Sequence, residues 1–240
     1  MSNEILWFLF AIVNFGLIVL VYKLFGKTGL FAWIAMGTIL ANIQVVMNVN
    51  FTVMGITLAA TLGNIMYGTL FLVTDALGEK YGHKEAKKAV YIGFFSLVSM
   101  VIIMQISLLF EPNSFDFAQG ALETIFGIVP RIALASLIAY SISQMLDVYL
   151  FKFLKERTKE KDLWIRNIGS TVVSQLIDSI IFVPIAFIMI SGIPGGYPKE
   201  IVWEIFWTTY LIKLFVAALD TPFVYLIKKI KPIEEKENLV

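Results

Sequence analysis

The chain has 240 residues, of which 58% are hydrophobic and 15% are charged. Soluble globular domains are about 45–50% apolar, so this composition excludes an ordinary soluble protein and favours an integral membrane protein. The absence of cysteine excludes disulfides and thiolate chemistry. The formal net charge of +1 says little until the charged residues are assigned to the two sides of a membrane.

Seven apolar runs follow one another along the chain and leave no room for a soluble domain. Each has about the 20 residues that cross roughly 30 Å of hydrocarbon. The first run has no basic flank and no small-residue cleavage site after it, so we interpret it as a retained helix rather than a signal peptide. The sequence predicts an all-α integral membrane protein with spans at 5–25, 29–49, 52–77, 89–110, 131–153, 167–191 and 204–228.

Two connections between the predicted spans have unusual composition. The segment 48–51, between the second and third spans, carries no charge, so it has to be a tight polar turn unless one of these spans is shorter. The segment 111–130 mixes large apolar residues with polar ones, and we expect it to hold a short helix in the membrane interface.

Nearly all basic residues fall on one side of the predicted membrane. Except for Arg131, Lys199 and Lys213, the 19 Lys and Arg residues lie in the first, third and fifth connections or in the C-terminal tail. The positive-inside rule places these segments in the cytoplasm. We therefore predict a multi-pass protein of the cell inner membrane with an external N-terminus and a cytoplasmic C-terminus.

Two predicted spans carry the same polar pattern, Ser-Gln-x-x-Asp, at 143–147 and 174–178. On a helix, the Ser, Gln and Asp of this pattern lie on one face. A carboxylate in the bilayer costs roughly 3 kcal/mol on insertion scales, so the pattern indicates a functional site. The two spans run in opposite directions, with Asp178 near mid-bilayer and Asp147 nearer the cytoplasm. We expect Asp178 to bind a ligand and Asp147 to act as a gate or an anchor.

Polar side chains recur at helical spacing on five of the seven spans, which predicts that these helices surround a cavity. Carboxylates and primary amides suit a planar ligand with adjacent donors and acceptors, such as a guanine-like base. Plainer interpretations stay open. Lys213 would also be explained by a structural ion pair with Asp178 or Asp220. The same groups would also suit a proton or cation path.

Motifs for catalysis are absent from the sequence. The segment 26–28 (Gly-Lys-Thr) lacks the upstream glycine of a phosphate-binding loop, and the only histidine, His83, lies in a connection. No metal-binding or serine-nucleophile motif occurs. We predict no enzymatic activity, no cofactor and no metal. The expected partners are the lipid bilayer and a nucleobase-like small molecule, with no nucleic acid and with a homodimer left open.

The segments 71–82, 131–136, 144–148 and 170–178, in this order, resemble the queuosine precursor transporter family, also called the vitamin uptake transporter family. The resemblance covers residues 33–229. It implies import of 7-cyano- or 7-aminomethyl-7-deazaguanine for tRNA modification. It also implies a six-helix core similar to the substrate-binding components of energy-coupling-factor vitamin transporters. On this basis residues 1–28 are an added N-terminal helix and turn, 29–230 the transport core and 231–240 a cytoplasmic tail.

The resemblance also implies roles for individual residues. Asp178 and Gln144 would bind the base edge, with amide contacts from Gln175 and Asn42. Arg131 would lie at the external mouth. Lys213 would balance charge or couple protons, and Asp75 and Asp147 would lie nearer the inner gate. Asp220 departs from the family pattern and receives no role. The predicted substrate-binding residues are Asn42, Asn64, Asp75, Arg131, Gln144, Asp147, Gln175, Asp178 and Lys213.

Two other classes of function remain open. The chain would be a substrate-binding subunit if it needed a partner ATPase, as the similarity to energy-coupling-factor components suggests. It would be an ion or proton channel if conductance did not depend on any base. Uptake by the purified protein alone would exclude the first alternative. Electrical recording tests the second, because a channel would conduct without any base.

Overall fold

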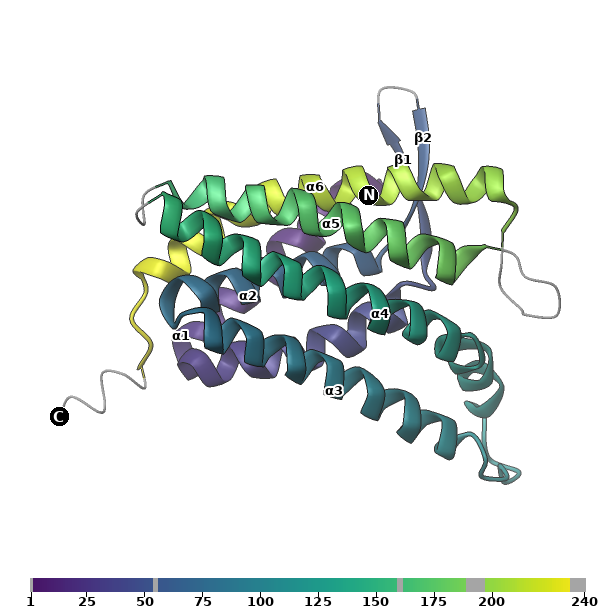
Figure 1. Ribbon diagram of the computed structural model, residues 1–240. Helices are drawn as coiled ribbons and strands as arrows, with labels where there is room; N and C mark the ends of the chain where they lie inside the picture. Colours follow the sequence, from purple (N-terminus) through teal and green to yellow (C-terminus); the bar gives the residue numbers. More distant parts are fainter. Residues whose placement is uncertain (1, 54–55, 159–161, 189–196, 234–240) are drawn as a thin grey trace.

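A computed structural model of the protein describes residues 2–53, 56–158, 162–188 and 197–233. Long helices lie side by side in a bundle, and a two-stranded hairpin projects from it (Figure 1). Lys159, Lys161, Lys236, the predicted span end at 189–191 and the tail residues 234–240 lie outside the described residues. In chain order the elements are α1 (Asn3–Gln44), β1 (Asn48–Val53), β2 (Ile56–Thr61), α2 (Gly63–Lys80), α3 (His83–Ser107), α4 (Gln119–Arg157), α5 (Leu163–Phe187) and α6 (Lys199–Lys229).

The first helix, α1, consists of two arms that fold back on each other. Gly26 has φ 52° and ψ −137°, a conformation that glycine adopts far more readily than other residues. The chain reverses there and brings the start of the first arm close to β1, which follows the second arm. Asn3 Nδ2 donates to Asn50 O at 3.0 Å. The arms correspond to the predicted spans 5–25 and 29–49, although the second arm ends at Gln44.

Residues 48–61, predicted to be a turn and the start of the third span, form an antiparallel hairpin instead. Its register opposes Asn48 to Thr61 and Val53 to Ile56. The prediction was wrong because it followed total hydrophobicity and overlooked the β-branched residues and the polar–apolar alternation of β1, which favour strands. The helix of the third span accordingly begins at Gly63 rather than at residue 52.

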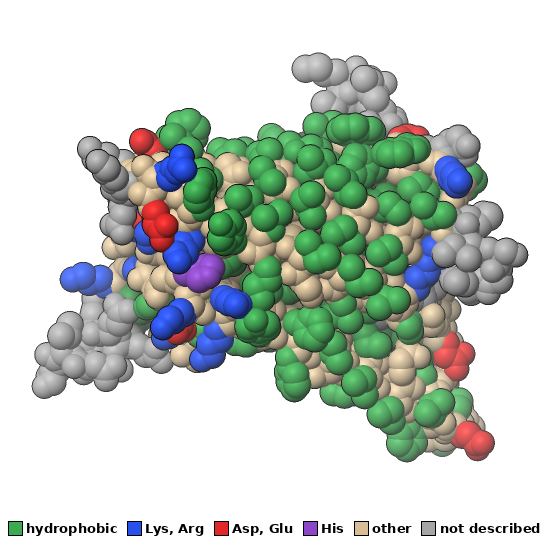
Figure 2. Space-filling view, in the orientation of Figure 1, with side chains coloured by type: hydrophobic (Ala, Val, Ile, Leu, Met, Phe, Trp, Pro, Cys, Tyr) green, Lys and Arg blue, Asp and Glu red, His purple; other side chains and the backbone are tan. Residues whose placement is uncertain are grey.

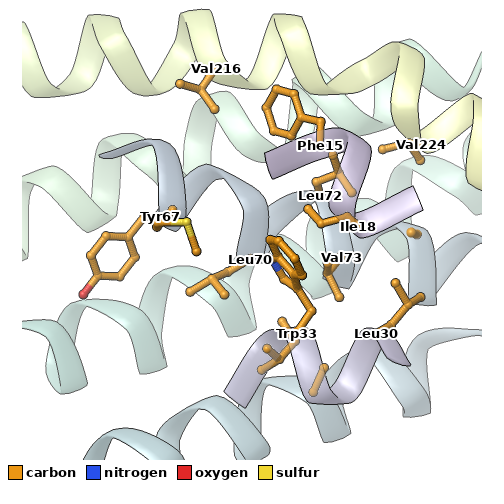
Figure 3. Close-up of a cluster of buried hydrophobic side chains, with 14 of the residues drawn as sticks. Phe15, Ile18, Leu30, Trp33, Tyr67, Leu70, Leu72, Val73, Val216 and Val224 are labelled. Atoms are coloured by element: carbon orange, nitrogen blue, oxygen red, sulfur yellow. The ribbon is translucent and has the colours of Figure 1, made fainter. Parts of the chain in front are cut away.

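Helix α2 lies inside the bundle, where protein surrounds it. Every residue from Gly63 to Gly78 is buried, and α2 packs against α1, α3, α4 and α6. Apolar side chains from α2, both arms of α1 and α6 meet around Leu70 and Val73 (Figure 3). Because α2 is shielded from lipid, it can carry polar residues such as Asp75 without exposing them to hydrocarbon.

Among the described residues, five helical stretches are long and apolar enough to cross a membrane: α1, α3, α5, and the parts of α4 and α6 at Pro130–Arg157 and Val202–Lys229. Hydrophobic side chains cover the middle of the molecule, and Lys and Arg gather at one end (Figure 2). We call this the basic end; it is formed by 23–28, 79–88, 152–158 and 228–231. The opposite end, which carries the hairpin, is the hairpin end.

Helix α4 is longer than the predicted fifth span because the expected interfacial helix joins it directly. The helix starts at Gln119 and continues through Pro130. A proline inside a helix leaves the carbonyl four residues earlier, here that of Phe126, without its usual partner. Gln105 Nε2 of α3 donates to this carbonyl at 2.9 Å. A side chain of the neighbouring helix thus replaces the missing bond.

Candidate functional site

The two Ser-Gln-x-x-Asp segments lie against each other on α4 and α5 and form reciprocal hydrogen bonds. Ser143 Oγ donates to Asp178 Oδ1 at 2.9 Å, and Ser174 Oγ donates to Asp147 Oδ1 at 2.8 Å. All four side chains are buried. Because the helices are antiparallel, the Ser of each segment lies level with the Asp of the other. The predicted opposite direction of the two segments is confirmed.

Asp178 also has a cationic partner. Lys213 Nζ of α6 forms an ion pair with Asp178 Oδ2, and the two side chains are 3% and 9% exposed. An opposite charge at hydrogen-bonding distance compensates part of the cost of burying each ion. Of the two partners considered for Lys213 from the sequence, the structure brings Asp178 to it.

A cavity of about 10 Å³ lies beside this ion pair. Tyr67 OH donates to Ser136 Oγ at 2.8 Å, and the rings of Tyr67 and Phe182 are 6.5 Å apart. This volume holds no more than about one water molecule, so a planar base would enter only if the helices separated. The lining residues are Val45, Asn64, Tyr67, Ser136, Asp178, Phe182 and Lys213.

The four predicted amide side chains are buried and keep polar atoms without a hydrogen-bond partner in the described part of the chain. Gln144 Oε1 accepts from Thr74 at 3.3 Å, while its Nε2 has no partner. Asn42 donates to a carbonyl of its own helix at 2.9 Å, and its Oδ1 remains. Asn64 Nδ2 and Gln175 Oε1 are also without partners. Since buried polar groups are normally paired, these atoms are candidate ligand contacts.

Three further carboxylic acids lie buried towards the basic end, on α2, α4 and α6. Asp75 and Asp147 lie where α2 and α4 pack together, between the Thr74–Gln144 hydrogen bond and the contact of Phe151 with Gly78, and in the described part of the chain neither oxygen of Asp75 accepts a bond from a protein donor. Asp220 Oδ1 accepts from Asn167 Nδ2 at 3.0 Å. Within the described residues, no group of three or more His, Cys, Asp or Glu could hold a metal ion. These acids are therefore not a candidate metal site.

A larger pocket, of about 330 Å³, lies between α2, α3 and α4 at the basic end. Asp75, which is 1% exposed, forms part of its wall, while the side chains of Lys152 and Glu156 are 51% and 66% exposed. The pocket therefore extends from the surface to a wall that includes Asp75. Its lining residues are Thr74, Asp75, Gly78, Gly82, His83, Ala86, Val148, Phe151, Lys152, Lys155 and Glu156.

Arg131 lies near the hairpin end and contacts backbone groups of α5. Its Nε donates to Ile185 O at 3.1 Å, and a second nitrogen donates to Ile188 O. Ile185 lies in the last turn of α5, where helix carbonyls lack backbone donors, and Ile188 follows the helix directly. Arg131 thus ties the start of the α4 span to the end of α5.

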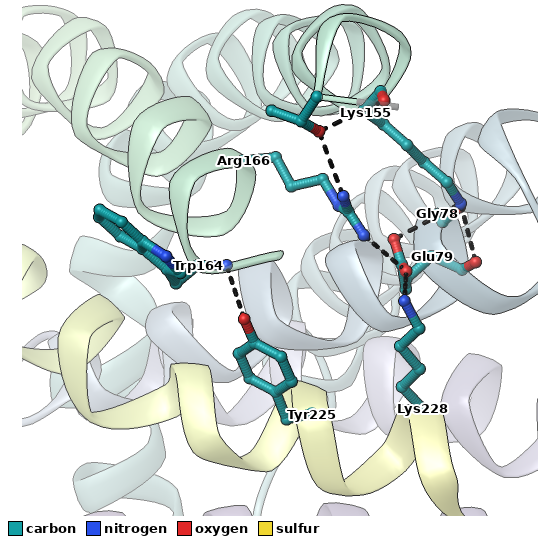
Figure 4. A network of polar contacts seen from close by, with 8 residues as sticks. Gly78, Glu79, Lys155, Trp164, Arg166, Tyr225 and Lys228 are labelled. Atoms are coloured by element: carbon teal, nitrogen blue, oxygen red, sulfur yellow. Dashed lines mark hydrogen bonds and ion pairs between the residues drawn. The ribbon is translucent and has the colours of Figure 1, made fainter. Parts of the chain in front are cut away.

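Glu79 joins four helices at the basic end, a role that the sequence interpretation missed (Figure 4). It is paired with Lys155 of α4, Arg166 of α5 and Lys228 of α6. Burial raises the pKa of Glu79, but the hydrogen bond from Lys228 and the charges of Lys155 and Arg166 outweigh burial and hold it below its ordinary value. Arg166 is fully buried, which a basic residue in a predicted loop does not suggest.

Six of the nine predicted residues fall into three groups, and Asn42, Gln144 and Gln175 line neither cavity. Asn64, Asp178 and Lys213 line the small cavity, Asp75 and Asp147 meet near the large pocket, and Arg131 lies apart from both. Gln144 contacts α2 through Thr74 and makes no hydrogen bond to Asp178. The sequence interpretation did not identify Asn167 of α5 as the partner of Asp220 of α6. The two helices follow each other in the chain, which is a signal that they pack together.

Residues 61–227 match the family model described as "Putative vitamin uptake transporter". A Bacillus subtilis (strain 168) protein named "Probable queuosine precursor transporter" is 48% identical over 239 residues, which cover 99% of this chain and 100% of that protein. Proteins of Haemophilus influenzae ("Probable queuosine precursor transporter") and Escherichia coli K12 ("Queuosine precursor transporter") are each 29% identical. These two matches cover 67% and 65% of this chain, and 64% and 67% of the relatives. No solved structure matches this chain.

Proposed function

Because this chain belongs to the transporter family described as "Putative vitamin uptake transporter", we propose that it imports queuosine precursors across the cell membrane. Support comes from three relatives whose names state this substrate, one of them similar over its whole length. The proposed substrates are 7-cyano-7-deazaguanine and 7-aminomethyl-7-deazaguanine, which serve tRNA modification. We propose that the basic end faces the cytoplasm, as the distribution of Lys and Arg suggests.

The main structural support is the Asp178–Lys213 pair together with Asn64, which lines the same cavity and has an amide nitrogen without a partner in the described residues. The buried amides of Asn42, Gln144 and Gln175 also keep polar atoms without partners there. A deazaguanine presents adjacent N–H donors and a carbonyl acceptor on one planar edge. A carboxylate accepts two parallel N–H bonds, and a primary amide supplies a donor beside an acceptor. We propose that Asp178 accepts from the base and that Gln144, Gln175 and Asn42 supply the amide contacts. Tyr67 and Phe182 offer aromatic faces to the same cavity.

The small volume of the cavity favours transport by alternating access. With room for about one water molecule, the site between α2, α4, α5 and α6 is closed around its polar groups. A base would bind after these helices separate towards one side, and its release would follow separation towards the other. The first arm of α1 contributes no residue to the lining of this cavity, and we propose 29–230 as the transport core on the basis of the family resemblance.

The test is rescue of queuosine in tRNA in a strain that cannot make the precursor and is given it in the medium. Expression of this chain is expected to restore queuosine, and Asp178→Asn is expected to abolish rescue while the protein is still present in the membrane. Glu111→Gln, which changes an exposed carboxylate, serves as a matched control and should rescue fully. Absence of rescue by well-expressed wild-type protein would sink the substrate assignment.

Reconstitution distinguishes an autonomous transporter from a substrate-binding subunit that needs a partner ATPase. The purified chain is placed in liposomes without any ATPase, and entry of labelled 7-cyano-7-deazaguanine is measured. Uptake by the chain alone supports an autonomous transporter. Tight binding of the base without uptake would favour the subunit that depends on a partner.

A further inference from the structure

Asp75 and Asp147 form a pair of acids whose contact requires a proton. Asp75 of α2 and Asp147 of α4 lie between two contacts of these helices, the Thr74–Gln144 hydrogen bond at 3.3 Å and the packing of Phe151 against Gly78. Two ionised carboxylates have no donor to place between them. Asp147 Oδ1 already accepts from Ser174, but Asp147 Oδ2 and both oxygens of Asp75 accept from no protein donor in the described residues. A single proton held between Asp75 and Asp147 would satisfy these atoms.

The charged groups around this pair favour a bound proton rather than a second negative charge. Asp220 of α6 adds a third acid, and it accepts a hydrogen bond from the neutral amide of Asn167. The two lysines of the pocket are paired elsewhere, Lys155 with Glu79 and Lys152 with Glu156. Glu79, one turn along α2, adds a further carboxylate, and the α6 lysines Lys213 and Lys228 pair with Asp178 and Glu79. On the other helices packed against α2, His83 of α3 lines the pocket, Tyr22 of α1 contacts Tyr81, Lys23 is exposed and Lys27 pairs with Glu85.

The large pocket gives this pair a route to solution. Asp75 is 1% exposed, lines the pocket and carries two oxygens without a donor, while the rim residues Lys152 and Glu156 are largely exposed. Both carboxyl oxygens of Asp75 are shielded from solvent behind the pocket wall, so water in the pocket of about 330 Å³ meets the carboxyl only when the packing of α2 against α4 opens. The Asp178–Lys213 pair is different, because its negative charge already has a buried cation.

The two acid sites are connected through neighbouring residues of α4. Ser143 binds Asp178, and the next residue, Gln144, accepts from Thr74, which precedes Asp75 in α2. A base that displaces Gln144 from Thr74 would disturb the wall of the pocket that holds Asp75. Substrate binding and proton exchange would in this way affect the same turn of α2.

We propose that Asp75 and Asp147 share one proton, release it to water in the basic-end pocket, and thereby couple substrate uptake to proton entry. In the release step the O–H bond of one carboxylic acid breaks, water accepts the proton, and a carboxylate remains. The inference rests on the proposed function, because it supplies the driving ion for that transport. It assigns to Asp75 and Asp147 a role that does not require either to contact the base.

The test uses the purified full chain in liposomes with labelled 7-cyano-7-deazaguanine. An external pH one unit below the internal pH is expected to give about tenfold accumulation per coupled proton, and a protonophore should remove it. Asp75→Asn and Asp147→Asn should lose this accumulation. Both should retain exchange of labelled for unlabelled base at equal pH. Glu156→Gln, which neutralises a carboxylate on the rim of the same pocket, should accumulate like the wild type.

The possible failures are distinguishable. Exchange by the wild type without any response to the pH gradient overturns the inference and leaves the proposed function intact, as does normal gradient-driven accumulation by both Asp→Asn variants. Failure of the folded wild type to bind or exchange the base overturns both. Infrared spectroscopy gives a readout that needs no transport. The carbonyl band of a protonated carboxylic acid should be present in the wild type and weakened in Asp75→Asn, and its absence from the wild type would contradict the shared proton.

Discussion

Asp178 and Asp147 end equivalent segments, and each accepts a hydrogen bond from a serine on the facing helix, yet their surroundings differ. Asp178 is paired with Lys213 beside a cavity of about 10 Å³. Asp147 faces another acid, Asp75, beside a pocket of about 330 Å³ that extends to the basic end. The two aspartates are only about 6 Å apart along the helix axes, since a helix rises 1.5 Å per residue.

The difference comes from the third helix that each acid meets. The Ser and Asp residues of α4 and α5 are nearly symmetric, but α6 presents a lysine to one aspartate and α2 presents an acid to the other. The same local sequence therefore yields a compensated charge at one position and a proton-binding pair at the other. Each prediction below either removes this difference or measures it.

The largest effect is expected for Asp178→Asn, because it leaves the Lys213 ammonium buried without a counter-charge. Removing one partner of a buried ion pair costs about 3–5 kcal/mol in the free energy of unfolding. For Asp147→Asn we expect a loss below about 1 kcal/mol, because no buried cation loses its partner. Denaturant unfolding in detergent measures both.

Adding Lys213→Met to Asp178→Asn provides the control for this comparison. The double variant should regain most of the stability, since no unpaired charge remains, but it should not regain uptake of the base. Equal destabilisation by Asp178→Asn and Asp147→Asn would contradict this prediction, because it would mean that the negative charge of Asp178 is not specifically balanced by Lys213.

A smaller effect is expected for Glu79→Gln, which loosens only the basic end. The buried guanidinium of Arg166 loses its carboxylate, and we expect a loss of about 2–3 kcal/mol. Because the pKa of Glu79 is lowered in the folded state, its stabilisation is complete at neutral pH. It is lost as the pH falls below the ordinary value of 4.5 and through the lower folded-state pKa.

Two measurements check the Glu79 prediction. The difference in Tm between wild type and Glu79→Gln should shrink as the pH falls below 4.5. Hydrogen exchange should rise around 152–166 but not around 178–187. A uniform rise along α5 would mean that Glu79 stabilises both ends of the bundle alike.

Gly68→Ala is expected to have a still smaller effect, at the contact between α2 and α6. A Cβ at Gly68 would lie 2.2 Å from Val216 Cγ1, so the helices would have to separate. Overpacking of this kind costs about 1–3 kcal/mol, and Val216→Ala in the same chain should relieve it. Because α2 and α6 supply the third partner to each aspartate, exchange of labelled base should fall in Gly68→Ala and recover in the double variant.

Small effects, close to that of Asp147→Asn, are expected for the two serines. Ser174→Ala should cost about 1 kcal/mol, which is typical of one buried hydrogen bond. Ser143→Ala should cost somewhat more, because its acceptor Asp178 is ion-paired and hydrogen bonds to charged groups are stronger. Thermal unfolding of the two variants side by side measures the difference, and a larger loss in Ser174→Ala would reverse the assignment of charge.

Much of the helical framework follows from the sequence, because apolar runs and basic connections report directly on a bilayer. The hairpin at 48–61 was missed since its residues are as hydrophobic as those of a span, and only their alternation distinguishes them. Helical spacing also places Asp178 and Lys213 on polar faces. It does not say which helices adjoin, so the choice between Asp178 and Asp220 as the partner of Lys213 needed the structure.

The meeting of Asp75 with Asp147 was out of reach for a similar reason. Spacing along α4 and α5 relates two consecutive helices, whereas α2 reaches the pair only through the packing of the whole bundle. Glu79 and Arg166 were assigned to connections because charge predicts solvent there. In the structure the two charges satisfy each other and are buried together.

The reciprocal Ser–Asp bonds also have a mechanical consequence. Because the bonds run in opposite senses between α4 and α5, any sliding of one helix along the other lengthens both at once, and a slip by one turn of about 5.4 Å breaks both. The α4–α5 pair is therefore expected to move as one rigid body.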